Sequence, residues 1–146
     1  MIKLTGPDGR LQLAVEIKSK TGASAEWVTQ LRRNLLAHSF MPPAPFFLLV
    51  LPDYSYLWTD ASAVNALAGP AFRVSTSEIL APYLKSDLSL NGLSVYGLGL
   101  LTTSWLNDLV RTDPQRGSAD AKPQWLLDSG LHGAISGDSV ELEAAA

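Results

Sequence analysis

The 146-residue sequence predicts an α/β domain built on a mixed sheet. Three observations predict this class: strand-like segments near the N-terminus, a capped amphipathic helix between two of them, and helix-like segments through the second half. The length suits a single domain with a real hydrophobic core. We therefore expect one domain over residues 1–146, with a core over 1–60 and a mostly helical extension over 61–146 packed on it.

A β-hairpin is expected at the start of the chain. Residues 2–5 alternate in polarity, and the sequence Gly6-Pro7-Asp8-Gly9 favours a turn, since proline presets one backbone angle and glycine tolerates positive φ. Residues 11–19 alternate again, which places their apolar members on one face of a strand. Those apolar members are Leu11, Leu13, Val15 and Ile17.

A helix and two further strands follow the hairpin. Ser24 is a candidate N-cap, and Trp27, Val28, Leu31 and Leu35 recur at helical spacing. After a proline-rich connector, residues 46–51 form an unbroken apolar run of strand length, and residues 54–58 form an aromatic-rich strand. Because the helix links the strands at 11–19 and 46–51, those two strands are expected to pair in parallel through a right-handed crossover.

The second half of the chain reads as helices and loops. We expect helices over 62–68, 77–84, 92–110 and 125–131, a polar loop over 114–122 and an edge strand over 140–142.

Glu16 and Lys18 are the residues of greatest chemical interest. Both lie on the polar side of the strand at 11–19, so their side chains project together from backbone positions about 7 Å apart. A carboxylate there can hold a divalent cation, while the ammonium orients a water or stabilises charge on a phosphate. The alternative is the solvated, charged face of a half-buried strand.

Charge is divided unevenly along the chain. The net charge is −3, but residues 1–50 contain six Lys and Arg against three Asp and Glu, a local charge of +3. Lys20, Arg32 and Arg33 are therefore candidates for contacts with nucleic-acid phosphates. The alternative for adjacent arginines on a helix is simple solvation.

Residues 1–60 resemble the core of the PD-(D/E)xK nuclease superfamily, which has a restriction-endonuclease-like fold. The resemblance is carried by the hairpin, by Val15-Glu16-Ile17-Lys18, by a helix with Gln30-Leu31-Arg32-Arg33, and by the two strands that follow. It implies that Glu16 is a metal ligand, that Lys18 is the catalytic lysine and that Gln30 supports the site. Asp8 is either a second metal ligand or only a turn residue; Glu26 is a further acidic candidate.

The function expected from these residues is magnesium-dependent (or manganese-dependent) hydrolysis of DNA. The alternative is a catalytically degenerate module that keeps the fold and binds protein or nucleic acid. The chain has no cysteine, and its two histidines, His38 and His132, lie in different segments, which argues against a zinc site. No Walker A loop or G-x-S-x-G motif is present.

The expected setting is the cytoplasm. No apolar run approaches the roughly 20 residues that cross a bilayer, so we expect no membrane partner. The composition is 47% hydrophobic and only 17% charged, which favours burial of some surface in a homodimer.

Overall fold

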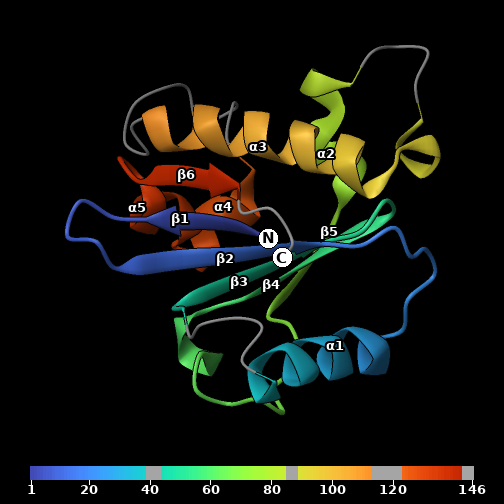
Figure 1. Ribbon diagram of the computed structural model, residues 1–146, viewed down its shortest axis with the longest axis horizontal. Helices are drawn as coiled ribbons and strands as arrows, with labels where there is room; N and C mark the ends of the chain where they lie inside the picture. The colour runs from blue at the N-terminus through green and yellow to red at the C-terminus, as the bar shows by residue number, and fades with distance from the viewer. Residues whose placement is uncertain (39–43, 85–88, 113–122, 143–146) are drawn as a thin grey trace.

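The computed structural model describes residues 1–38, 44–84, 89–112 and 123–142. A six-stranded mixed sheet in the order β5-β4-β3-β2-β1-β6 forms its centre, with helices on both faces (Figure 1). The strands are β1 (Ile2–Thr5), β2 (Leu11–Ile17), β3 (Phe46–Val50), β4 (Tyr54–Trp58), β5 (Phe72–Ser75) and β6 (Ser139–Leu142). The α-helices are α1 (Ala25–Ala37), α2 (Thr76–Leu80), α3 (Val95–Arg111), α4 (Gln124–Ser129) and α5 (Leu131–Ile135).

The crossover between β2 and β3 organises the sheet. These two strands pair in parallel, whereas the other neighbouring strands pair antiparallel, as the sequence predicts for the first four strands. Ser24 caps α1 by accepting the Trp27 N–H at 3.1 Å, so the predicted cap is confirmed. All five residues of β3 are buried, which fits an apolar strand between neighbours and beneath helices on both faces.

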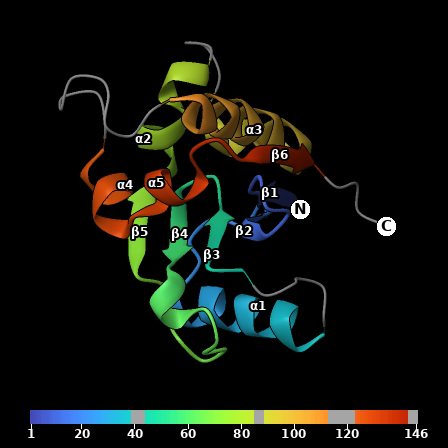
Figure 2. The same cartoon turned by 90° about the vertical axis from the view of Figure 1, so that its left-hand side faces the viewer.

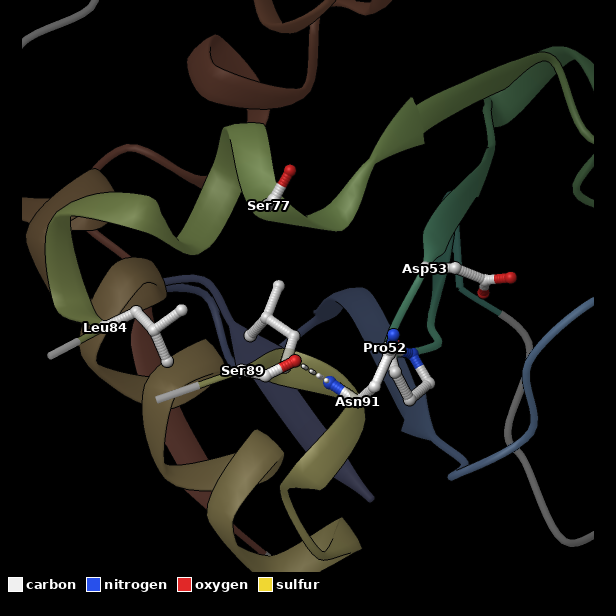
Figure 3. A pocket seen from close by; sticks show the side chains of 7 residues that line it. Pro52, Asp53, Ser77, Leu84, Ser89 and Asn91 are labelled. Atoms are coloured by element: carbon white, nitrogen blue, oxygen red, sulfur yellow. Dashed lines mark hydrogen bonds between the residues drawn. The ribbon is translucent and has the colours of Figure 1, made fainter. Parts of the chain in front are cut away.

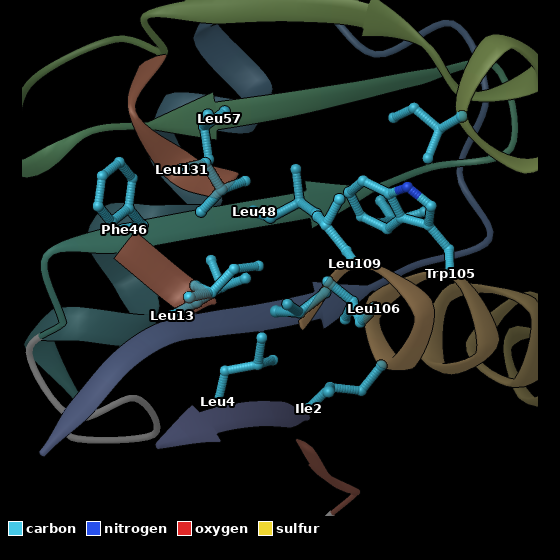
Figure 4. Packing of buried hydrophobic residues seen from close by; sticks show 14 of the residues in the cluster. Ile2, Leu4, Leu13, Phe46, Leu48, Leu57, Trp105, Leu106, Leu109 and Leu131 are labelled. Carbon is cyan, nitrogen blue, oxygen red and sulfur yellow. The ribbon is translucent and has the colours of Figure 1, made fainter. Parts of the chain in front are cut away.

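The larger core lies between the sheet and α3 (Figure 4). Leu13 and Leu48 of the strands lie in one buried cluster with Trp105 and Leu106 of α3, and Leu57 lies in the same cluster beside Leu131 of α5. A Cβ on Gly99 would lie 3.4 Å from the Ile17 Cδ1 atom, so the glycine permits α3 to pack closely over the end of β2.

The opposite face of the sheet is covered by α1 and the chain segment after β4 (Figure 2). Its core contains Ala14 of β2, Leu49 of β3 and Trp58 of β4, packed against Val28 and Leu31 of α1. The even-numbered positions of β2 therefore face α1, and the odd-numbered positions face α3.

The second half of the chain differs from expectation in four places. The helix expected over 62–68 is wrong: a short 3₁₀ turn, Asp60–Ser62, is followed by isolated turns, and the Ser62 and Asn65 carbonyls accept both a backbone N–H three residues on and the Arg32 guanidinium. Strand β5 was not expected, because four residues leading directly into a helix show little period-two pattern. The helices at 77–84 and 125–131 each break into two pieces.

Other expectations for this half hold. Helix α3 covers most of the expected range 92–110, starting at Val95 and ending at Arg111, and its cap Ser94 accepts the Gly97 N–H at 3.0 Å. The predicted edge strand is β6, which pairs with β1. The loop expected over 114–122 lies outside the described residues. Further 3₁₀ turns are Ala81–Tyr83 and Leu90–Gly92.

Candidate functional site

Glu16 and Lys18 lie at the carboxyl end of β2, next to the parallel strand β3. Glu16 pairs with Leu49 in the ladder, and the ladder continues past the strand, because the Lys18 N–H donates to the Val50 carbonyl at 3.2 Å. Strand alternation therefore places both side chains on the α1 side of the sheet. Glu16 is half-buried and Lys18 is exposed, so a partly desolvated carboxylate lies beside a solvated ammonium.

The Glu16 carboxylate accepts one long hydrogen bond in the structure, from the Ile17 N–H at 3.3 Å. Such a bond occupies one of about four lone-pair positions of a carboxylate. Among the described residues no other hydrogen bond to this carboxylate is present, so its remaining positions can accept a cation or water.

The loop after β2 is tied to the turn between β3 and β4. The Gly22 N–H donates to Asp53 Oδ2 at 2.8 Å, and the other oxygen of Asp53 accepts the Tyr54 N–H at 2.9 Å. Lys20 on this loop places its Nζ 5.1 Å from the centre of the Trp27 ring, a cation–π contact. Asp53 thereby fixes the path of the chain that carries Lys18 and Lys20, a role that its place in a Pro-Asp turn did not reveal.

A cavity of about 460 Å³ opens beside the same turn (Figure 3). In Figure 3 the Asp53 carboxylate points away from Ser89 and Leu84, so serine hydroxyls and an asparagine provide the polar groups of the hollow. The lining residues are Pro52, Asp53, Ser77, Leu84, Ser89, Leu90 and Asn91.

Asp8 does not lie near Glu16. It sits in the β1–β2 turn, where its Oδ1 accepts the Arg10 N–H at 3.0 Å and its Oδ2 lies 3.7 Å from Arg10 Nε. From Leu11 to Glu16 the strand advances five residues, about 17 Å. One metal ion bound to both carboxylates requires their oxygens within about 5 Å, so the structure does not bring these two candidate ligands together.

Gln30 and Glu26 occupy the outer flank of α1. At 100° per residue they lie opposite the buried Val28 and Arg32, and Gln30 donates to Asn34 Oδ1 at 3.1 Å. They line a cavity of about 360 Å³ with Arg33 and Leu67. The structure thus places Gln30 away from Lys18.

The three basic candidates have different surroundings. Lys20 and Arg33 are exposed, whereas Arg32 is only 2% exposed and its guanidinium lies 5.5 Å from the Trp58 ring centre. Arg32 Nη1 donates to the Asn65 carbonyl at 2.8 Å and Nη2 to the Ser62 carbonyl at 2.9 Å. Burial lowers the pKa of Arg32. Its guanidinium holds the segment after β4 and is not presented to a phosphate.

The position opposite Glu16 on β1 belongs to Met1. The antiparallel register pairs Ile2 with Val15 and Lys3 with Ala14, and its next step pairs Met1 with Glu16. Met1 packs with the α1-side core, in agreement with this register. Within the described ranges, no group of three or more His, Cys, Asp and Glu residues is arranged to hold a metal. The reactive groups brought together are therefore Glu16 and Lys18, without a second carboxylate from β1.

No family model matches this chain, and no curated protein or solved structure is significantly similar to it. Within the part of the chain that the structure describes, no helix is long and apolar enough to cross a membrane.

Proposed function

We propose that this chain is a nuclease-type α/β protein with a restriction-endonuclease-like core, and that Glu16 and Lys18 form the reactive pair of a magnesium- or manganese-dependent DNA phosphodiesterase. The observation that carries the proposal is the backbone pairing: Glu16 pairs with Leu49 at the carboxyl end of β2, and the Lys18 N–H continues this parallel ladder, so strand alternation directs both side chains to one face. A carboxylate and an ammonium adjacent at a strand end suit metal-assisted attack of water on a phosphate.

Each residue has a distinct role in this proposal. Glu16 would hold the cation through its open carboxylate positions, and the exposed Lys18 would hold a proton-donating ammonium near the attacking water or the phosphate. The bound metal supplies Lewis-acid polarisation of the phosphate and lowers the pKa of water. Lys20 would contact a neighbouring phosphate from the loop that Asp53 fixes.

The residues fit Mg²⁺ only weakly. Mg²⁺ in proteins uses one or two carboxylates and completes its octahedron with waters and substrate phosphates. Glu16 supplies one carboxylate, so we expect affinity for the cation to be low without DNA and higher with it.

A cleavage assay tests the proposal. The unaltered full chain and the variants Lys18→Ala and Glu16→Gln are each incubated with supercoiled and linear DNA in Mg²⁺ on the order of 10 mM. Glu78→Gln and Arg111→Ala, at exposed helical positions, serve as charge-matched controls. The proposal predicts metal-dependent cleavage lost in the first two variants and retained in the controls; cleavage by Lys18→Ala at the rate of the unaltered chain contradicts it.

The register suggests a gain-of-function variant. In a chain extended at its N-terminus, Met1→Asp would place a carboxylate directly opposite Glu16. A second ligand is expected to tighten Mn²⁺ binding on the order of tenfold. Calorimetric titration measures this change, and the same variant carrying Glu16→Gln is the control.

A second candidate function is favoured by the position of Asp8 at the far end of β2. In this alternative the chain is a non-catalytic nuclease-fold module that binds nucleic acid or protein. Absence of cleavage by the unaltered chain, together with DNA binding that is unchanged by Glu16→Gln, would support the module over the enzyme.

A further inference from the structure

Asp8 and Asp138 meet at Gly6, at the opposite end of β2 from Glu16. Thr5 pairs with Ser139 at the end of the β1–β6 ladder, so the next step of the register places Gly6 beside Asp138. The turn then folds back over Gly6, because Gly6 N–H donates to the Arg10 carbonyl and Gly9 N–H to the Gly6 carbonyl, each at 2.9 Å. The turn thereby brings the Asp8 side chain close to Gly6.

Both carboxylates lie close to the position that a side chain on Gly6 would occupy, and Gln12 Cγ lies 3.8 Å from it. A Cβ at this position would lie 3.1 Å from Asp8 Oδ1 and 3.5 Å from Asp138 Oδ1. The two oxygens are therefore at most 6.6 Å apart. A Ca²⁺ ion held at 2.3–2.6 Å from each spans up to about 5 Å, a difference that rotation of Asp8 can close because its side chain is 56% exposed.

Within the described ranges, Asp138 lacks a partner suited to a carboxylate. It is only 7% exposed, and its buried Oδ2 has no hydrogen-bond partner among the described residues. Burial and the nearby charge of Asp8 both raise the pKa of Asp138, to about 6. A buried ionised carboxylate beside a second carboxylate is costly unless a cation compensates it.

We propose that Asp8 and Asp138 form a site for a hard divalent cation, Ca²⁺ in particular, held between their carboxylates beside Gly6, where the β1–β2 turn meets the start of β6. Two carboxylates supply up to four oxygens, and water completes the six to eight that Ca²⁺ takes in irregular geometry. The ion would link the first hairpin to the last strand. Its affinity is expected in the weak range, about 0.1–1 mM, because the carboxylates number only two.

Calcium titration of the full chain in chelator-treated buffer at pH 7.5 tests this site. The measurements are calorimetry and the shift of Tm. At ten times Kd the unaltered chain is expected to gain about 3–5 °C in Tm. Asp8→Asn and Asp138→Asn are expected to weaken binding at least tenfold, and Gly6→Ala to weaken it by crowding the two carboxylates while keeping both charges.

Two controls separate this site from the proposed nuclease centre. Gly133→Ala, at an exposed helical glycine with nothing within 4 Å, matches Gly6→Ala, and Glu16→Gln removes the carboxylate of the other site; both are expected to bind Ca²⁺ as the unaltered chain does. Circular dichroism is used to check that Asp138→Asn is folded. Asp8→Asn changes an exposed side chain and therefore tests the site without disturbing the core. The proposal is overturned if no saturable binding is found up to about 10 mM Ca²⁺, which is ten times the highest Kd expected. It is also overturned by unaltered affinity in Asp8→Asn, or by loss of binding in Glu16→Gln.

Discussion

Replacement of Asp138 by asparagine is predicted to stabilise the protein at neutral pH in the absence of divalent cations. The amide keeps the shape of the side chain and removes a charge that is buried next to Asp8. Such a gain is unusual, because most substitutions at buried positions destabilise.

The magnitude follows from the pKa of this carboxyl group. Burial first, and the charge of Asp8 second, raise the pKa of Asp138 from 3.8 to about 6 in the folded chain. Each pKa unit between the folded and unfolded chain corresponds to about 1.4 kcal/mol, so ionising Asp138 costs the folded state about 3 kcal/mol.

The direction of this pKa shift determines the pH range over which the stability changes. Because the pKa is raised on folding, the folded chain binds more protons than the unfolded chain between pH 4 and 6, and stability from this group falls as pH rises through that range. Asparagine does not titrate. The stability difference between variant and unaltered chain is therefore expected to be near zero at pH 4 and to reach about 3 kcal/mol, in favour of the variant, above pH 7.

Urea unfolding at intervals from pH 4 to 8, in the presence of a chelator, measures this difference. Comparison at each pH cancels the titration of all other groups, and an unchanged m-value confirms that both chains unfold alike. Asp60→Asn, at an exposed position, is the matched control and is expected to stay within about 0.5 kcal/mol throughout. A difference that does not change between pH 4 and 8, or a variant that is less stable at pH 8, would show that the buried charge of Asp138 is not what limits stability.

Three further predictions test the packing and the proposed chemistry. Arg32→Ala removes two donors from the carbonyls of Ser62 and Asn65 and is expected to cost about 2–4 kcal/mol by chemical denaturation, while Arg33→Ala, at an exposed position, stays within about 0.5 kcal/mol; equal effects would contradict the buried role of Arg32. Lys18→Ala is expected to leave the free energy of unfolding within about 0.5 kcal/mol while abolishing any metal-dependent cleavage, so a large loss of stability would point to a structural lysine instead. Gly99→Leu is expected to cost about 1–3 kcal/mol in thermal unfolding, because the side chain would collide with Ile17 under α3, and a Tm equal to that of the unaltered chain would show that the two elements separate easily.

Local pattern accounts for what the sequence predicts correctly about the fold. Alternation over β2, the apolar run of β3 and the Ser24 cap are properties of neighbouring residues, and each appears as expected. The same-face placement of Glu16 and Lys18 also follows from strand alternation alone. The parallel pairing of β2 and β3 follows because the helix between them returns the chain to the edge of the sheet at which β2 begins.

The candidate site was predictable only in part, because its other members depend on distances across the fold. Asp8 is eight positions from Glu16 in sequence, yet it lies in the turn before Leu11, and Leu11 is itself about 17 Å from Glu16 along the extended strand β2. Gln30 is on the expected helix, but the burial of Val28 and Arg32 turns it outward.

Residue pattern was therefore sufficient for the mixed α/β class, the first hairpin, the capped helix and the shared face of Glu16 and Lys18, because period and capping act over a few residues. The folded arrangement was needed to show that Arg32 is buried against carbonyls 30 and 33 residues away, and that Asp8 meets Asp138 at Gly6. These outcomes depend on which distant segments the core and the sheet order bring together. Desolvation and charge at such contacts then determine what each polar group does.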